Sequence, residues 1–382
     1  CTVTCPNGFD MSQVCKSARE NMVSTDKMPL APHEFALMDM LFSNSEAFLS
    51  RPQPGFETCR YVFFPGCQAG AIAPDVVMQA YEDLSKRAEG GVALMLGCCG
   101  AVSEWAGRCE MTEKVTEQLK QELAKLGNPT IIAGCPSCMK QLKERIGAQV
   151  TGIWEIVKEI GLPAQAKGLE IPVAVHDACG ARGDARTQDT IQELLADMGC
   201  TVEDTEYSRD FSPCCGYGGL TAYANKDMAA KMAEKCLERS DAPYITYCMA
   251  CRDRFAREGR ESRHILELLY GAAASNMPDI SEKRYNRLVL KETLLKNIWN
   301  EERIMEKKEY TVTYTEEAIC MMDERMILKS DVERVLSDYR ASQEAILDEE
   351  TKELVTRSRL GNVTFWVRFV ETEDGYLVRR AY

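Results

Sequence analysis

Ten of the eighteen cysteines fall into two copies of one pattern. Each copy has a lone cysteine, a Cys-Cys-Gly about thirty residues later, and a Cys-x-x-Cys about thirty-five residues after that. The first copy comprises Cys67, Cys98, Cys99, Cys135 and Cys138, and the second comprises Cys179, Cys214, Cys215, Cys248 and Cys251. Because a tetrahedral zinc ion uses four ligands, five thiolates per copy favour a larger inorganic group, twice over.

Disulfides and zinc are the alternatives for these cysteines. Disulfide frameworks belong to short secreted domains, whereas this chain has 382 residues, is 27% charged and shows no secretory signal peptide. Zinc would account for each Cys-x-x-Cys but would leave the adjacent pairs and the lone cysteines unexplained. Soft thiolates select iron–sulfur clusters, so we favour clusters.

Short apolar runs and amphipathic stretches alternate around the cysteines, which predicts an α/β fold. The expected strands are 60–64, 130–133, 173–176 and 244–247, and the clearest expected helices are 112–126 and 226–239. Two of these strands run directly into a Cys-x-x-Cys. Ligands at strand ends converge on one edge of a sheet. Two similar units generally pack about a pseudo-twofold axis, so we expect two clusters to face one cleft.

The residues around the cysteines resemble those of the cysteine-rich CCG-domain family, whose best-known member is the B subunit of heterodisulfide reductase. The resemblance covers about residues 57–272. The motifs that carry it are Phe64-Pro65-Gly66-Cys67, Ala133-Gly134-Cys135-Pro136-Ser137-Cys138, His176-Asp177-Ala178-Cys179, Cys214-Cys215-Gly216-Tyr217-Gly218-Gly219 and Ser262-Arg263-His264-Ile265-Leu266-Glu267-Leu268-Leu269.

In that family a complete five-cysteine set binds a noncubane four-iron cluster whose iron meets a substrate sulfur directly. The resemblance therefore implies two such clusters and the reduction of a small disulfide or thiol substrate in two one-electron steps. Several relatives lack cysteines in one copy, whereas this chain retains all ten. Other relatives serve in glycolate and lactate oxidation, where clusters only relay electrons from a flavoprotein. A non-catalytic scaffold or redox sensor is a third hypothesis.

His176 and Asp177 are the candidate catalytic pair, because splitting a disulfide into two thiols consumes two protons and imidazole titrates near neutrality. A histidine at a strand end beside a cluster can also be a hydrogen-bond donor to sulfur or a packed core residue. Both alternatives remain open from the sequence.

The N-terminus adds a second cysteine motif. Cys1-Thr-Val-Thr-Cys5-Pro6 is similar to the end of a ferredoxin run, and helical segments are expected over 7–22 and 31–48. The segment resembles the end of the small ferredoxin-like C subunit of heterodisulfide reductase. This implies a cubane [4Fe-4S] cluster held partly by Cys1 and Cys5 in the intact protein, with earlier ligands on a missing piece.

The C-terminal region has a different composition. We expect a charged helix or helix pair over 281–309, with Leu290 and Leu294 on one face, and then a small α+β domain ending in a hairpin around Asp374-Gly375. It weakly resembles the extension of fusion proteins that join a flavin- and nicotinamide-linked disulfide-oxidoreductase-like domain to cluster-binding domains. The expected domains are 1–56 (end of the ferredoxin-like domain), 57–168 and 169–275 (two CCG units), 276–308 (helical linker) and 309–382 (α+β).

Composition limits the partners and the compartment. A net charge of −13 argues against nucleic acid, and no apolar stretch is long enough to span a bilayer. Abundant thiols outside any secretory context predict a reducing cytoplasm, and exposed clusters indicate anaerobic life. No glycine-rich nucleotide fingerprint is present, so flavin is expected only on a partner or a missing domain that supplies electrons.

Overall fold

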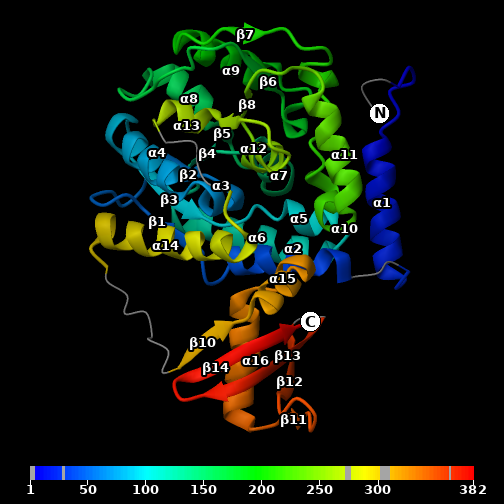
Figure 1. The fold of residues 1–382 in the computed structure, drawn as a ribbon. Coiled ribbons are helices and arrows are strands. Elements are labelled where there is room, and N and C mark those ends of the chain that lie inside the picture. The colour runs from blue at the N-terminus through cyan, green and yellow to red at the C-terminus, as the bar shows by residue number, and fades with distance from the viewer. Residues whose placement is uncertain (1–4, 28–30, 272–276, 302–309, 361–362) are drawn as a thin grey trace.

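The computed structural model describes residues 5–27, 31–271, 277–301, 310–360 and 363–382. Its elements form three sheets with helices around them (Figure 1). Two mainly parallel sheets form the larger body, and a third sheet forms a separate C-terminal layer with two helices. This arrangement confirms the α/β fold class.

The first sheet contains the first cysteine set. Its strand order is β1-β3-β2-β4-β5, and all neighbours are parallel except β1 and β3. The strands are β1 (Leu49–Arg51), β2 (Tyr61–Phe64), β3 (Val92–Leu96), β4 (Thr130–Ala133) and β5 (Val150–Gly152). The helices between and after them are α3 (Cys67–Ile72), α4 (Pro74–Arg87), α5 (Ala101–Trp105), α6 (Cys109–Lys125), α7 (Pro136–Ile146) and α8 (Ile153–Ile160).

The second sheet repeats this plan with four parallel strands in the order β7-β6-β8-β9. The strands are β6 (Val173–His176), β7 (Val202–Glu203), β8 (Tyr244–Thr246) and β9 (Ser262–His264). The helices are α9 (Ala185–Asp197), α10 (Thr221–Ala224), α11 (Lys226–Leu237), α12 (Met249–Arg257) and α13 (Ile265–Leu269), with short 3-10 turns η1 (Cys179–Ala181), η2 (Arg209–Phe211) and η3 (Gly218–Leu220).

The two units share one hydrophobic core. Alternate residues of β2, such as Phe63, lie in the same buried cluster as Val175 of β6 and Ile245 of β8. The other face of the first sheet, which includes Val62, packs in a second cluster with α2 and α6. Strands buried on both faces are typical of parallel sheets covered by helices. The paired units are therefore one packed body.

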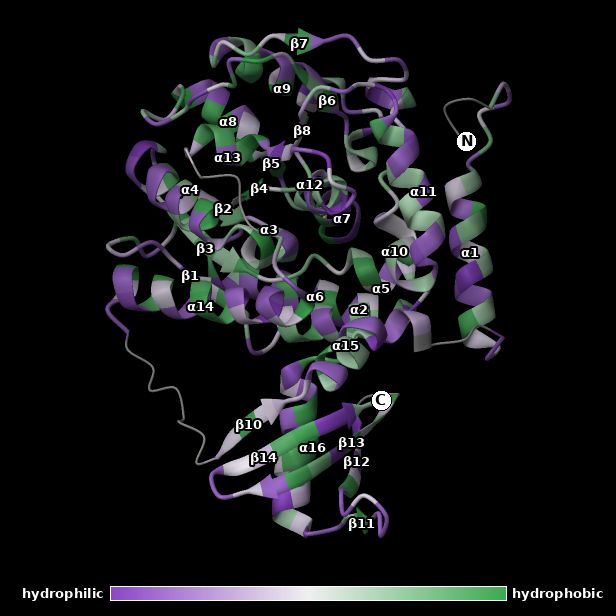
Figure 2. Cartoon of the chain, in the orientation of Figure 1, coloured by the Kyte–Doolittle hydropathy of each residue, from purple (hydrophilic) through white to green (hydrophobic). Residues whose placement is uncertain are grey.

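Two N-terminal helices and one later helix cover this body. α1 (Met11–Ser24) stands at its edge and α2 (Ala31–Ser43) packs in the second cluster. α1 carries both hydrophobic and hydrophilic residues, yet it has no buried residue (Figure 2). α14 (Ile280–Trp299) lies across α3 and α4, where Leu290 and Leu294 are each 1% exposed.

The C-terminal sheet has the order β10-β14-β13-β12-β11 and packs against two helices. Its strands are β10 (Thr311–Tyr314), β11 (Ile346–Leu347), β12 (Leu354–Leu360), β13 (Val363–Thr372) and β14 (Gly375–Ala381), and its helices are α15 (Glu316–Arg325) and α16 (Lys329–Ser342). Its third strand in sequence, β12, was not predicted. The hairpin of β13 and β14 around Asp374-Gly375 agrees with the expectation.

Several expected boundaries change. The helix expected over 31–48 ends at Ser43, because residues 49–51 pair with β3 as an edge strand. The segment expected over 281–309 contains one helix that ends at Trp299, and its residues 302–309 lie outside the described part of the chain. No helix among the described residues is long and apolar enough to cross a membrane.

Candidate metal centre

Most cysteines of the pattern lie just beyond the carboxyl end of a parallel strand or in the first turn of the helix that follows it. In the first unit, Cys67 follows β2 and opens α3, Cys98 and Cys99 follow β3, and Cys135 follows β4 as the N-cap of α7. In the second unit, Cys179 follows β6, and Cys248 follows β8 as the N-cap of α12. The strand ends therefore bring the first set to the carboxyl edge of its sheet, whereas in the second set Cys214 and Cys215 lie in the loop that follows η2.

The first set forms a row of neighbouring thiols. The Sγ atoms of Cys67 and Cys98 are 3.5 Å apart. Cys98 is hydrogen-bonded to Cys99, which is hydrogen-bonded to Cys138, and Cys138 contacts Cys135 in the same way. All five thiols of the first copy thus lie in one continuous group.

The second set forms an equivalent row. The Sγ atoms of Cys251 and Cys215 are 3.2 Å apart. Cys215 is hydrogen-bonded to Cys214, which is hydrogen-bonded to Cys179, and Cys251 also contacts Cys248. The order of contacts matches that of the first set.

The two rows meet. The thiols of Cys135 and Cys248, the first members of the two Cys-x-x-Cys pairs, are hydrogen-bonded to each other. Because these residues occupy equivalent places in the two copies, the pseudo-twofold relation passes between them. The two rows are therefore connected, and contacts run without a break through all ten pattern cysteines.

A cavity of about 60 Å³ opens at this junction. Its lining includes the five thiols of the first set together with Cys248, Trp105 and Tyr217. The second copy therefore contributes walls to the first site. Among the described residues, no three His, Cys, Asp or Glu side chains converge as the ligands of one metal ion would.

Burial and mutual contacts shift the thiol pKa values in opposite directions within each row. Hydrogen bonds from Cys138 and Cys98 lower the pKa of Cys99 to about 6, although burial raises it. Hydrogen bonding to Cys214, followed by burial, raises the pKa of Cys179. Hydrogen bonds from Cys179 and Cys215 lower the pKa of Cys214. Each row thus contains a thiol that ionises readily beside thiols that donate to it, and thiolates are the metal ligands.

Two glycines are required at the adjacent cysteine pairs. Gly100 and Gly216 directly follow them with φ of +86° and +87°, a conformation that other residues rarely adopt. A Cβ on Gly216 would also lie 2.6 Å from the carbonyl oxygen of Ala229. These turns fix the direction in which each Cys-Cys pair faces.

Residues outside the CCG units also hold the first set. The side-chain amide of Asn44 donates to the Cys98 carbonyl at 3.1 Å, and its oxygen accepts the Cys98 N–H at 2.7 Å. Arg287 of α14 donates to the Cys67 carbonyl at 2.9 Å. Neither residue was predicted. One feature of the sequence could have indicated that Arg287 is buried, since it falls on the helix face that carries Leu290 and Leu294.

His176 and Asp177 lie at the end of β6, but both are buried. Burial, followed by the charge of Arg239, lowers the pKa of His176 to about 3, so its ring is neutral. Arg239 Nη2 lies 3.3 Å from His176 Nδ1. Because arginine only donates, Nδ1 accepts and Nε2 carries the proton. A proton-donor role for His176 stays a prediction that this burial disfavours.

Asp177 has a local role that the sequence did not indicate. Its carboxylate accepts the Arg209 N–H at 2.6 Å and the Tyr247 hydroxyl at 3.0 Å. These bonds tie the loop before Cys214 to the strand end before Cys248. Asp177 therefore orders the backbone near the second set.

One of the two predicted N-terminal ligands falls within the described residues. Cys1 lies outside them, and Cys5 precedes α1, the helix that stands at the edge of the body (Figure 1). Backbone N–H groups of Phe9 and Asn7 lower the pKa of Cys5. Six further cysteines lie outside both motifs, namely Cys15, Cys59, Cys109, Cys200, Cys236 and Cys320.

The geometry agrees with comparisons to known proteins. The family model of the cysteine-rich CCG domain matches residues 61–143 and 173–255, which contain all ten thiols of the two rows. The chain thus contains two CCG cysteine-rich domains. It is homologous to the D subunit of heterodisulfide reductase and to uncharacterized archaeal iron–sulfur proteins.

The relatives are distant. An uncharacterized iron–sulfur protein of Methanocaldococcus jannaschii is 25% identical over 222 residues, which cover 54% of this chain and 44% of that protein. The chain therefore spans less than half of that relative's length. The D subunit of dihydromethanophenazine:CoB–CoM heterodisulfide reductase of Methanosarcina acetivorans is 21% identical over 296 residues, 69% of this chain and 71% of that protein. No solved structure matches.

Proposed function

We propose that this chain is the iron–sulfur module of an oxidoreductase that binds one four-iron cluster on each row of thiols and reduces a disulfide or related sulfur substrate. The observation that carries the proposal is the junction of the rows at Cys135 and Cys248. Two clusters held there would be adjacent, so each could take one half of a disulfide.

The donor set fits such clusters. Each row supplies five soft thiolates, and Cys98, Cys99, Cys138, Cys215 and Cys251 are at most 6% exposed. A noncubane cluster supplies, when bound, an iron that can meet a substrate sulfur. The chain's residues orient the thiols through the glycine turns, and they exclude water by the apolar packing around them.

The overall reaction would add two electrons and two protons to a disulfide, giving two thiols. The electrons require a donor, and we place a flavin on a partner protein or on a domain beyond this sequence. Since the heterodisulfide reductase relative is named as one subunit of that enzyme, a complex is the expected setting. A cubane cluster held partly by Cys1 and Cys5 would connect that donor to the two rows.

Electron relay is the second candidate. It is favoured by the small volume of the cavity, about 60 Å³, and by the burial of the first set. In that case the two clusters would pass electrons between a flavoprotein and a carrier, as in the glycolate- and lactate-oxidising relatives.

The test is the iron and acid-labile sulfide content of anaerobically prepared protein, with electron paramagnetic resonance spectra before and after addition of a disulfide or thiol. Two clusters predict about eight irons per chain. A new signal on adding the sulfur compound supports reduction at the cluster, whereas about eight irons without a response support relay. Stoichiometric zinc with little iron would contradict both.

A further inference from the structure

The two thiol rows differ in one respect that breaks their pseudo-symmetry. α14 packs on α3, the helix that Cys67 opens, and brings Arg287 to the first row. Arg287 is 4% exposed, and its Nε donates to the Cys67 carbonyl oxygen at 2.9 Å. A permanent cation is therefore buried against the backbone of a ligand in the first row.

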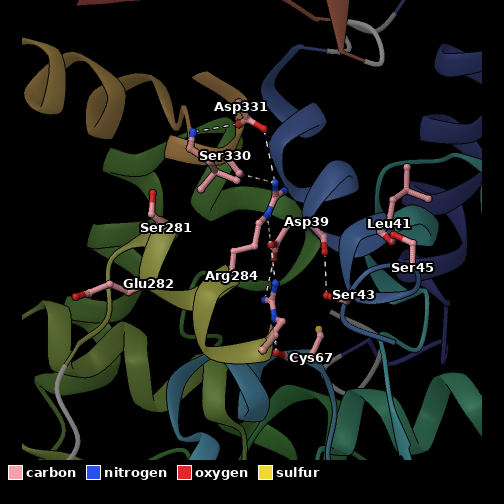
Figure 3. A network of polar contacts seen from close by, with 12 residues as sticks. Asp39, Leu41, Ser43, Ser45, Cys67, Ser281, Glu282, Arg284, Ser330 and Asp331 are labelled. Atoms are coloured by element: carbon pink, nitrogen blue, oxygen red, sulfur yellow. Dashed lines mark hydrogen bonds and ion pairs between the residues drawn. The ribbon is translucent and has the colours of Figure 1, made fainter. Parts of the chain in front are cut away.

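Asp39 of α2 fixes the orientation of this cation. Its two carboxylate oxygens accept from Arg287 Nη1 at 2.6 Å and from Nη2 at 2.9 Å. Burial raises the pKa of Asp39, but the charge and hydrogen bonds of Arg287 outweigh it, so the pKa is lowered and the carboxylate is ionised. The guanidinium of Arg287 therefore links Asp39 to the Cys67 carbonyl, with Nε toward the ligand. Figure 3 shows the polar network that includes Asp39, Arg284 and Cys67. The positive end of the pair faces the first row.

Two arginines near the second row donate to backbone carbonyls outside that row. Arg182 is exposed and donates to the Ser212 carbonyl. Arg239 donates to the carbonyls of Cys236, Glu206 and Tyr207. These acceptors are not cysteines of the second row, and solvent screens the exposed Arg182. Arg252, which directly follows Cys251, is also buried, and it pairs with Glu267 at 3.3 Å. A buried charge is screened much less, and the guanidinium of Arg287 also donates directly to the backbone of the ligand Cys67, so Arg287 has the stronger effect on its neighbour.

We propose that Arg287, oriented by Asp39, is a positioning residue that holds Cys67 and makes the cluster of the first row the more easily reduced of the two. The inference rests on the proposed binding of two clusters. Reduction adds negative charge to a cluster, so a buried cation nearby stabilises the reduced form. Electrons would collect first on the cluster that borders the cavity at the junction of the rows.

Arg284 provides a matched control on the same helix. It lies one turn before Arg287, with its Nε 3.9 Å from Asp39 and its Nη1 3.6 Å from Asp331 of the C-terminal domain. Its guanidinium also lies over the Phe42 ring at 4.5 Å. It carries the same charge at similar burial but does not reach Cys67.

The experiment is an anaerobic redox titration of the full chain, followed by electron paramagnetic resonance, on wild type, Arg287→Met, Arg287→Lys, Asp39→Asn and Arg284→Met. Iron content is measured on each sample. In Arg287→Met we expect the first-row cluster to become at least tenfold harder to reduce at a given potential. This corresponds to a reduction potential lower by about 59 mV for a one-electron couple. The other cluster should be unchanged. Arg287→Lys should recover most of the loss.

Asp39→Asn separates an electrostatic effect from loosened packing. It removes the negative end of the pair, so the same cluster should become easier to reduce, the opposite sign to Arg287→Met. Arg284→Met should leave both potentials unchanged. With about eight irons retained, equal shifts of both clusters, no shift, or the same sign in both variants would overturn the inference. Wild type that binds no iron would instead refute the proposed function.

Discussion

At the scale of single residues, Cys135 and Cys248 matter because they join two sites that the sequence presents as separate. Within each row, every thiol contacts a neighbour of its own copy, and the bond between Cys135 and Cys248 connects one row to the other. Non-ligand cysteines can lie close by without joining a row. The Cys236 Sγ donates to the Cys214 carbonyl at 3.4 Å and is fully buried.

Cys251 and Cys236 therefore provide a pair of substitutions with different outcomes. Cys251→Ser should remove about half of the iron, since one of two clusters loses a ligand. Cys236→Ser should keep all of it, because a hydroxyl can still donate to the Cys214 carbonyl. Anaerobic iron and sulfide determination checks both. Equal losses in the two variants would mean that Cys236 is a ligand or that the fold has failed.

His176 predicts a pH dependence of stability. Burial, followed by the charge of Arg239, lowers the pKa of His176 to about 3 in the folded protein. In the unfolded chain the histidine has its ordinary pKa of about 6.5, so between these pH values only the unfolded chain binds the proton. The stabilisation is complete above pH 6.5 and is lost as the pH falls toward 3. One such group contributes a slope of at most about 1.4 kcal/mol per pH unit.

His176→Asn should lower the free energy of unfolding at pH 7, because the ring loses its edge contact with Phe255 at 4.7 Å. It should also flatten the pH dependence. Denaturant unfolding under anaerobic conditions at pH 7, 6 and 5 measures both. An unchanged slope would show that His176 is already protonated in the folded protein.

At the scale of elements, α1 is attached to the body by polar contacts. Lys16 of α1 pairs with Glu104 at 2.9 Å, and Glu104 also binds Arg145 at 2.9 Å and Gln141 at 3.0 Å. Burial raises the pKa of Glu104, but these partners lower it to about 2. One carboxylate thus connects α1, α5 and α7.

Glu104→Gln should destabilise the protein by about 1 to 2 kcal/mol at pH 7, because partly buried charged hydrogen bonds are lost. Because the pKa of Glu104 is lowered on folding, its carboxylate stabilises the folded protein fully at pH values above the unfolded pKa of about 4.3. That contribution is lost as the pH falls toward 2. The difference from wild type should therefore shrink between pH 4 and 2. Denaturant midpoints at these pH values check it.

Glu144→Gln is the control for this element. Glu144 pairs with Lys140 at 3.9 Å, and both side chains are more than half exposed. Exposed pairs contribute about 0 to 1 kcal/mol, so this variant should behave nearly as wild type. A loss as large as that of Glu104→Gln would indicate a general charge effect.

At the scale of the whole molecule, the two CCG units depend on close backbone contact. A Cβ on Gly180, next to Cys179, would lie 2.9 Å from the Ser137 amide nitrogen and 3.0 Å from its hydroxyl. Ser137 is between the two cysteines of the first Cys-x-x-Cys. A glycine of the second unit therefore permits the ligand loops of both units to meet.

Gly180→Ala should push these loops apart and lower the iron content of both rows, with a loss of stability of about 1 to 3 kcal/mol. Gly218→Ala is the matched control, since a Cβ there meets nothing within 4 Å and its φ is not in the left-handed region. Iron content and thermal unfolding compare the two. If Gly180→Ala kept full iron, the contact between the units would not be needed for cluster binding.

The sequence by itself determined the two cysteine patterns and the α/β class. Alternation of apolar runs with cysteine motifs is local information, and the family match confirms the two CCG domains. The sequence did not determine every helix and strand boundary. The helix expected over 31–48 ends at Ser43, and strand β12 was not predicted.

Only the tertiary structure decided which residues support the thiols from a distance. Arg287 and Asp39 are separated by 248 positions, and Asn44 and Cys98 by 54. The junction of Cys135 with Cys248 likewise requires two units to pack on one shared core. Periodicity reports the buried face of each element but carries no information on which distant element covers it, so these partners follow from packing alone.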